Sequence, residues 1–251
     1  MMQTIAKRFN QSLKSYPVEA HVQQSVFDLL LQKLSPKAFN NSTILELGCG
    51  DGRLSFRLLK ALKASSIDAV DCADLCISVA KKYLQDPTYQ KVNAHFYCLD
   101  FDYELHQLQK KYQLIFANMS LQWSRDFNAL LKQLADKLAD NGHLCFSMPL
   151  AGTFTELSSH FRINDFYTHE TIKQFLAELG FVIQSAEKKY YQLSFATARA
   201  QLKHIKQTGV NCYLGKRQPN LSKIKSYIKA NAPAELSYQI GLYTVYKPPR
   251  R

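Results

Sequence analysis

The spacing of hydrophobic residues divides this chain into short continuous runs and longer amphipathic segments. A continuous apolar run of about 4–8 residues is typical of a buried strand. Such runs predict strands over residues 44–47, 67–71, 95–101, 114–118 and 143–148. Hydrophobic residues at helical spacing predict helices over 53–62 and 127–139, the second ended by Asn141 and Gly142. Strands that alternate with helices favour an α/β fold with a mostly parallel, doubly wound sheet.

The first predicted strand leads into a glycine-rich turn over residues 48–52, with the sequence GCGDG. Glycines at a strand-to-helix turn let the backbone approach a nucleotide-like ligand closely, since no Cβ atom intervenes. The spacing fits a dinucleotide site or an S-adenosylmethionine site, and a turn without a ligand is the plainer alternative. Glu46 precedes the first glycine by two positions, and its carboxylate would repel a pyrophosphate but attract the ammonium group of S-adenosylmethionine. We therefore interpret the turn as a class I methyltransferase site.

Polar residues near the ends of the later strands extend this site. Asp71 ends the second strand and is suited to bind two ribose hydroxyls. Asp100 can accept a hydrogen bond from an adenine amino group, and the ring of Phe101 can pack on the purine. Asn118 ends the fourth strand, where an acceptor would meet the methyl group. Each residue alone is compatible with an ordinary strand end, but their order along the chain favours a cofactor site.

Composition narrows the class of protein. A chain of 251 residues that is 46% hydrophobic can bury a full core, as one large domain or as one domain with a small lid. No apolar stretch of about 18 residues is present to span a membrane, and residues 1–16 do not resemble a signal peptide. The six cysteines lack the paired spacing of a zinc site, so no metal is expected. Reduced thiols in the cytoplasm are the simplest interpretation.

The net charge of +12 is concentrated near the C-terminus. Residues 199–251 contain eleven lysines and arginines but a single acid, Glu235. The segment 195–207 is predicted to be helical, with Arg199, Lys203 and Lys206 on one side. A basic helical stripe attracts acidic partners, either a nucleic acid or an acidic protein. A solvated helix face without a partner is the alternative.

Four further segments carry a resemblance to a known family. Phe9, Tyr16 and Gln23 are followed by Asn118 with Gln122-Trp123, then by the segment 152–157 and by Lys206 three residues before Gly209. In this order and spacing they are similar to malonyl-acyl carrier protein O-methyltransferases of biotin synthesis. The similarity extends from about residue 5 to about residue 246. Val210 departs from it, standing where that family usually has alanine, and the region 161–167 is hard to match.

The resemblance implies a Rossmann-like class I methyltransferase fold with a seven-stranded sheet, helices on both faces and a helical lid. It implies one domain over residues 1–251, with an N-terminal cap at about 1–40 and helical insertions at about 150–170 and 195–235. The cofactor would be S-adenosylmethionine, and the partner an acyl carrier protein that carries a malonyl thioester. The enzyme would methylate the free malonyl carboxylate, without a membrane or a metal ion.

The resemblance also suggests a role for each candidate residue. Cofactor binding is expected from Gln23, Glu46, Gly48, Gly50, Gly52, Asp71, Asp100, Phe101 and Asn118. The hydroxyl of Tyr16 would lie near the transferring methyl group. Lys206 would pair with the malonyl carboxylate, with Arg125 and Arg162 as competing candidates. Contact with the substrate or its carrier is expected from Trp123, Arg162, Arg199 and Lys203.

Other functions remain open at this point. A small-molecule carboxylate methyltransferase would use the same cofactor turn without the basic helix. An RNA methyltransferase would fit the charge, but residues 118–121 read NMSL and lack the prolines and aromatic residue typical of base-amine methylation. A non-enzymatic carrier-binding or RNA-binding protein would have a degraded cofactor turn, whereas Glu46, three glycines and both aspartates are present here.

Overall fold

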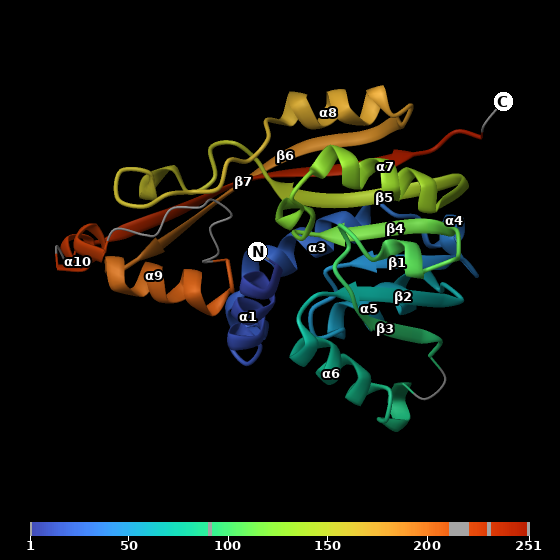
Figure 1. Cartoon of the computed structure of the whole chain (residues 1–251), viewed down its shortest axis with the longest axis horizontal. Helices are drawn as coiled ribbons and strands as arrows, with labels where there is room; N and C mark the ends of the chain where they lie inside the picture. Colours follow the sequence, from blue (N-terminus) through green and yellow to red (C-terminus); the bar gives the residue numbers. More distant parts are fainter. Residues whose placement is uncertain (1, 90–91, 211–220, 230–231, 250–251) are drawn as a thin grey trace.

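The computed structural model describes residues 2–89, 92–210, 221–229 and 232–249 (Figure 1). The strands are β1 Thr43–Leu47, β2 Ser66–Asp71, β3 Ala94–Cys98, β4 Tyr112–Asn118, β5 Leu138–Pro149, β6 Val182–Phe195 and β7 Ala234–Tyr246. The helices are α1 Met2–Ser12, α2 Tyr16–Glu19, α3 His21–Gln32, α4 Pro36–Phe39, α5 Arg53–Leu62, α6 Asp74–Tyr83, α7 Phe127–Lys137, α8 His169–Glu178, α9 Ala198–Gln207 and α10 Leu221–Lys229. Short 3-10 turns occupy Pro87–Tyr89, Leu105–Gln107, Leu121–Trp123 and Thr155–Leu157.

Within the described residues the strands form one seven-stranded sheet in the order β3-β2-β1-β4-β5-β7-β6. The first five strands are parallel, and β7 pairs antiparallel with both β5 and β6. The chain order reverses beside β1, so the carboxyl ends of β1 and β4 separate there. In open α/β sheets, ligands bind at this point. The expected fold class is confirmed.

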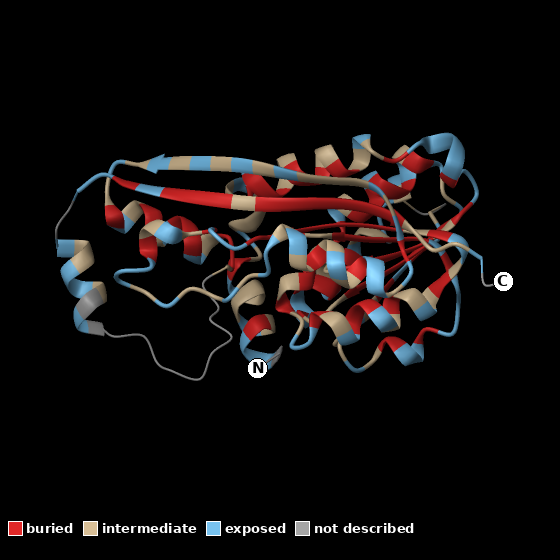
Figure 2. Cartoon of the chain, turned by 90° about the horizontal axis from the view of Figure 1, so that it is seen from above, coloured by how far each residue is buried: buried red, intermediate tan, exposed pale blue. Residues whose placement is uncertain are grey.

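Two hydrophobic cores lie on opposite faces of the sheet. Alternate residues of the strands point to opposite faces, so Ile44 packs with α3 and α5, whereas Leu45 packs with α7 and α8. Burial on both faces explains why the central strands are continuous apolar runs. Figure 2 shows the buried strands between the outer helices, with β6 half-exposed at the edge.

The antiparallel strands β6 and β7 are joined by residues 196–233, and we call this strand pair the β6–β7 hairpin. It extends beyond the other strands (Figure 1). Helices α9 and α10 lie along this extension, and the hydrophobic residues Leu202 and Ile205 of α9 pack into the same core as Leu236 and Tyr238 of β7. Thr197 caps the N-terminus of α9, because its side chain accepts a hydrogen bond from the amide of Ala200 at 3.2 Å. The hairpin therefore carries the basic helix outside the parallel half of the sheet.

Several boundaries predicted from the sequence are wrong, among them the starts of β4 at Tyr112 and of β5 at Leu138. The third strand ends at Cys98, so Asp100 and Phe101 lie in the turn that follows it. The helix predicted over 127–139 ends at Lys137, because Leu138 already has extended backbone and pairs with Tyr112 of β4. The helix predicted from residue 195 begins at residue 198, since Phe195 is the last residue of β6. In each case the pairing between strands, and not the local hydrophobic pattern, sets the boundary of the element.

The expected helical insertion at about 150–170 is also wrong in character. This segment holds turns and one 3-10 turn, Thr155–Leu157, before α8 begins at His169. Positive φ angles at Gly152 and Phe154 interrupt any helix there. Within the expected insertion at 195–235, the structure describes α9 and α10, while Cys212 and the basic residues Lys216 and Arg217 lie outside the described residues.

Candidate active site

A cavity lies at the carboxyl ends of β1, β2 and β4, and residues of α1, α2 and α3 line it from the N-terminal side. Its floor comes from the glycine-rich turn and from the strand ends at Asp71 and Asn118. Its wall comes from the N-terminal cap, including Phe9, Tyr16 and Gln23. Most of its polar groups converge from different elements, as expected for a small-molecule site.

The glycines of the turn serve different physical purposes. Gly48 has a φ of +76°, and a Cβ there would lie 2.3 Å from the Cβ of Ser120, whose hydroxyl donates to the Leu47 carbonyl at 2.7 Å. Gly50 lines the cavity, and its position has open space where a side chain would be. Gly52 does not line the cavity, and a Cβ there would meet Ala80 and Phe96 at 2.8 and 2.9 Å. Gly52 is thus required for packing between α5 and its neighbours, and not for the cavity wall.

Glu46 points from β1 into this cavity and is only 3% exposed. Its Oε2 atom has no hydrogen-bond partner among the described residues. The pKa of Glu46 is raised from 4.5 to about 7, chiefly by burial and to a smaller extent by the negative charge of Asp71, while the Ser55 hydroxyl opposes the shift. A buried carboxyl group without a partner is costly, so the site favours a cationic ligand group beside Glu46.

Asp71 holds the turn in place. Its Oδ2 accepts a hydrogen bond from the Gly50 amide and its Oδ1 from the Ala73 amide, both at 2.9 Å. Burial raises the pKa of Asp71, although these amides and that of Cys72 oppose the shift. Asp71 lines the cavity, and its proposed contact with ribose stays a prediction.

Beyond β3, the structure separates the next pair of candidates. Phe101 is buried and lines the cavity. Asp100 does not line it and accepts a hydrogen bond from the Asp102 amide at 3.0 Å. Burial raises the pKa of Asp100. The adenine contact expected of Asp100 stays a prediction, since in this structure the carboxyl group is occupied by its own turn.

Gln23 and Asn118 join the cap to the sheet. The Asn118 amide donates to the Gln23 carbonyl at 2.9 Å, and its oxygen accepts from the Ser147 hydroxyl at 2.9 Å. The side-chain amide nitrogen of Gln23 is buried with no partner among the described residues. Together with the free oxygen of Glu46, it leaves one buried donor and one buried acceptor for a bound ligand.

Aromatic residues close the cavity on the cap side. Phe9 contacts Tyr16 edge-on at 6.3 Å and Trp123 edge-on at 5.8 Å between ring centroids. All three rings line the cavity. Burial raises the pKa of Tyr16 above its ordinary value, and the negative charges of Asp71 and Asp51 raise it further. Its hydroxyl therefore stays protonated at neutral pH and can donate a hydrogen bond.

None of the cations expected near the substrate lines this cavity. Lys206, Arg199, Lys203 and Arg162 are exposed and lie outside its lining. Arg125 is also exposed and donates to the Tyr103 hydroxyl at 2.6 Å.

Sequence reasoning missed Arg53. Among the described residues it is the one lysine or arginine in the cavity lining, and it pairs with Asp51 at 2.8 Å. Its position directly after the last glycine of the turn was the available signal.

Groups of three or more metal-binding side chains are absent from the described part of the chain. Its helices are too short or too polar to cross a membrane.

Comparison with known proteins places this geometry in a family. A family described as methyltransferase domain matches residues 18–186. The chain is 30% identical over 244 residues to malonyl-[acyl-carrier protein] O-methyltransferase 2 of Coxiella burnetii, covering 97% of this chain and 95% of the relative. The chain belongs to the methyltransferase domain family.

Two further likenesses concern the sequence and the fold in turn. A malonyl-[acyl-carrier protein] O-methyltransferase of Bacillus anthracis is 37% identical over 161 residues, which cover 63% of this chain and 57% of the relative. The crystal structure of the YcgJ protein from Bacillus subtilis has a TM-score of 0.65 at 11% identity, covering 90% of this chain and all of that chain. The last likeness supports the fold alone. Membership of the family establishes S-adenosylmethionine as the cofactor.

Proposed function

We propose that the protein transfers a methyl group from S-adenosylmethionine to the free carboxylate of a malonyl thioester on acyl carrier protein. The resemblance makes this an early step of biotin synthesis. One observation carries the proposal, the 30% identity that extends over 97% of the chain to a relative named for this reaction. The aligned length includes the cofactor cavity, the N-terminal cap and the hairpin, so it includes the parts that would select the acceptor.

The described residues fit the cofactor. S-adenosylmethionine supplies a methyl group activated by a sulfonium centre and also carries an ammonium group. Glu46 offers an unpartnered buried acceptor and Gln23 an unpartnered buried donor. Asp51 and Asp71 add negative potential to the same cavity. This acidic lining favours a cationic ligand.

The reaction needs no general base. A malonyl half-thioester is ionised at neutral pH, because carboxyl pKa values lie near 4. The residues have to orient the carboxylate oxygen and exclude water, and such positioning contributes roughly 7–11 kcal/mol in well-aligned cases. Phe9, Phe101 and Trp123 give the cavity apolar walls. The protonated hydroxyl of Tyr16 is our candidate donor to the acceptor carboxylate.

Arg53 replaces Lys206 as our candidate cation for that carboxylate. Its position in the cavity lining supports the role, whereas Lys206 is exposed and outside the lining. The guanidinium is partly neutralised by Asp51, which leaves other N–H groups for a ligand. Arg53→Gln should raise KM for the malonyl acceptor more than KM for S-adenosylmethionine. The reverse would assign Arg53 to the methionine carboxylate of the cofactor.

Transfer of labelled methyl to malonyl-acyl carrier protein tests the proposal. Acetyl-acyl carrier protein, malonyl-CoA and bulk tRNA are assayed in parallel. Base-labile label on the malonyl carrier protein, with none on the acetyl form, is the expected result. Equal efficiency with malonyl-CoA would favour a small-molecule carboxylate methyltransferase. Label in tRNA alone would overturn the assignment.

A further inference from the structure

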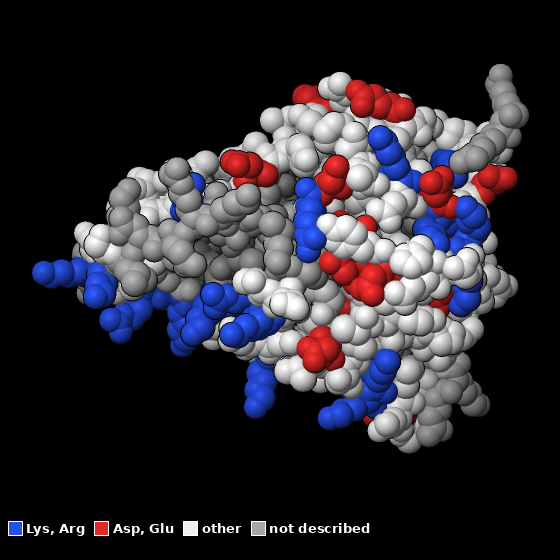
Figure 3. All heavy atoms as spheres, in the orientation of Figure 1, with Lys and Arg blue, Asp and Glu red and all other residues white. Residues whose placement is uncertain are grey.

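Helices α1 and α9, with the turn that follows α1, present a basic surface beside the cavity. We call it the α1–α9 surface, and it contains the cations Lys7, Arg8, Lys14, Arg199, Lys203 and Lys206. All are exposed except Arg8, which is half-buried. Figure 3 shows lysine and arginine side chains gathered over α1, α9 and α10, whereas acidic side chains lie mainly over other parts of this face.

In the part of the chain that the structure describes, these six cations have no ion pair with an acid. Elsewhere Arg57 pairs with Asp28 at 2.6 Å, and Lys110 pairs with Asp68 at 3.0 Å. Glu19, the last residue of α2, lies 3.5 Å from His204 of α9. The surface thus keeps its positive potential for an outside partner.

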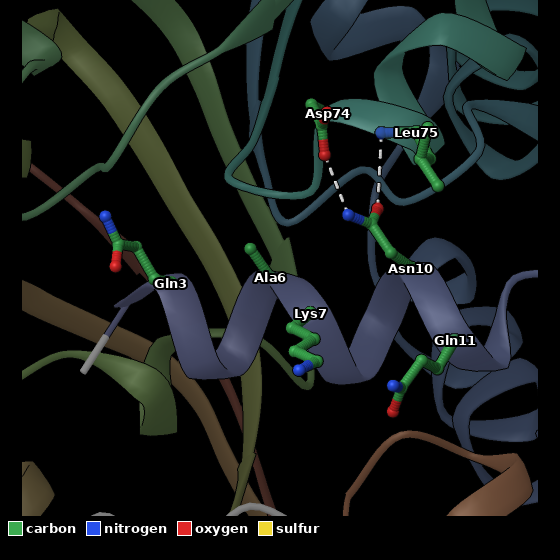
Figure 4. Close-up of a pocket in the computed structure, with 7 residues that line it drawn as sticks. All are labelled: Gln3, Ala6, Lys7, Asn10, Gln11, Asp74 and Leu75. Atoms are coloured by element: carbon green, nitrogen blue, oxygen red, sulfur yellow. Dashed lines mark hydrogen bonds between the residues drawn. The ribbon is translucent and has the colours of Figure 1, made fainter.

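The two helices are joined, so their cations form one surface. The Ser15 hydroxyl donates to the Gln207 carbonyl at 2.9 Å. Gly209, which follows α9, packs so closely that a Cβ would lie 2.8 Å from the Ser12 hydroxyl and 2.9 Å from the Phe9 ring. At the other side of α1, Asn10 donates to Asp74 at 2.7 Å and accepts from the Leu75 amide at 3.2 Å (Figure 4). Lys7 points away from Asp74 in the same view.

The α1–α9 surface adjoins the cavity wall. Leu13, Tyr16 and Pro17 line the cavity, and Lys14 and Ser15 lie between them in the chain. A partner bound to this surface would therefore rest against the segment that carries the candidate hydroxyl. Val18 in the same segment is 66% exposed. An exposed apolar residue among cations favours a protein partner, because nucleic-acid interfaces are more uniformly polar.

We propose that the α1–α9 surface docks an acidic face of the acyl carrier protein and so brings its thioester arm to the cavity beside Tyr16. The inference rests on the proposed function for the identity of the partner. Charge complementarity is its basis, since the surface holds six cations that have no ion pair among the described residues, together with one exposed apolar residue. Docking of this kind depends on salt concentration, because exposed charges are screened.

A pair of charge-reversed variants tests the docking surface. Arg199→Glu/Lys203→Glu changes two exposed residues of α9. The matched control, Lys60→Glu/Lys132→Glu, makes the same change of net charge at exposed positions of α5 and α7. Binding of fluorescently labelled apo-acyl carrier protein is measured by anisotropy, and methyl transfer is measured with malonyl-acyl carrier protein and with malonyl-pantetheine. Thermal unfolding of each variant, with and without S-adenosylmethionine, verifies folding, and Arg199→Gln/Lys203→Gln provides a milder second variant.

We expect the α9 variant to weaken carrier binding and raise KM for the malonyl carrier protein by at least about tenfold at low salt. The ratio of kcat/KM for the carrier substrate to kcat/KM for malonyl-pantetheine should fall by the same factor, and the control variant should match the native protein. Equal binding by both double variants would overturn the docking surface while leaving the proposed function standing. If the α9 variant loses carrier binding but the native protein transfers no methyl group, the result would support docking and refute the proposed function. Displacement of the carrier by tRNA at lower concentration than by unlabelled carrier would assign the surface to nucleic acid.

Discussion

The cofactor end of the parallel sheet and the outer end of the β6–β7 hairpin differ in charge and in burial. The cavity at the first is lined by Glu46, Asp51 and Asp71, with Arg53 as its described cation. The hairpin end carries α9, whose Arg199 lies in the most basic fifth of the chain. β1 is buried along most of its length, whereas β6 alternates between exposed and half-buried residues.

This contrast suggests a division of work. A cationic cofactor is attracted to an acidic, enclosed cavity, and an acidic macromolecule is attracted to an exposed basic surface. Variants at the cofactor end should therefore affect every acceptor equally. Variants at the hairpin end should affect only an acceptor carried on protein.

Gly48→Ala should have the largest effect. Its Cβ would lie 2.3 Å from Ser120 at a φ of +76°, so strain and overpacking together should cost roughly 2–5 kcal/mol of unfolding free energy. Binding of S-adenosylmethionine should be lost as well. Urea unfolding and calorimetry measure the two effects.

Gly180→Ala provides the control for backbone strain. Gly180 has a φ of +75° but nothing within 4 Å of an added Cβ. It should lose only about 1–2 kcal/mol. Equal losses at both glycines would show that the contact with Ser120 is easily relieved.

Tyr16→Phe should lower kcat about 10–100-fold with both the carrier substrate and malonyl-pantetheine. The reason is the loss of one hydrogen bond to a charged oxygen, which is worth about 1.5–3 kcal/mol. The dissociation constant of S-adenosylmethionine should change by less than about threefold, since the ring remains. An unchanged kcat would show that Tyr16 only lines the cavity and that its hydroxyl has no role in the reaction.

Glu46→Gln should remove the pH dependence that Glu46 gives to the stability of the protein and to its affinity for S-adenosylmethionine. The folded-state pKa of about 7 lies above the ordinary 4.5, so the folded protein retains a proton that the unfolded chain releases. Stability from this group is present below pH 4.5 and is lost as pH rises to about 7. An ammonium ligand needs the ionised form, so native affinity for S-adenosylmethionine should weaken up to about tenfold per pH unit below 7.

Calorimetry at several pH values, together with chemical unfolding, measures both effects of this substitution. The glutamine variant should bind the cofactor weakly at every pH. It should also be the more stable protein above pH 7 in the absence of ligand, because no buried carboxylate has to ionise. An unchanged pH profile would exclude Glu46 as its origin.

Asn10→Ala should have the smallest effect. It removes two exposed hydrogen bonds between α1 and α6, so we expect about 0.5–1.5 kcal/mol of lost stability and a few-fold weaker cofactor binding. Gln11→Ala, one residue further along, is the matched control. Equal cofactor affinity in both variants would show that Asn10 does not hold the cap over the cavity.

Local pattern was sufficient for most of the parallel half. The apolar runs located β1, β2 and β4, and the glycine spacing located the start of α5 at Arg53. Boundaries failed where long-range pairing decides, as at Leu138, which extends β5 beside β4 instead of ending α7. The prediction of a helical insertion at 150–170 failed, because hydrogen bonds to β7 hold the turns of this segment and no local sequence signal distinguishes such turns from a short helix.

The sequence alone thus determined the cofactor class, because the glycines, Glu46 and Asp71 restrict the kind of ligand that the turn can bind. The tertiary structure alone decided which side chains share the cavity. It placed Arg53 and Phe9 there, and it left Lys206 on an exposed helix. The reason is that a cavity forms from segments far apart in the chain. Phe9 and Trp123 meet across a ring contact of 5.8 Å, and no sequence spacing encodes that distance.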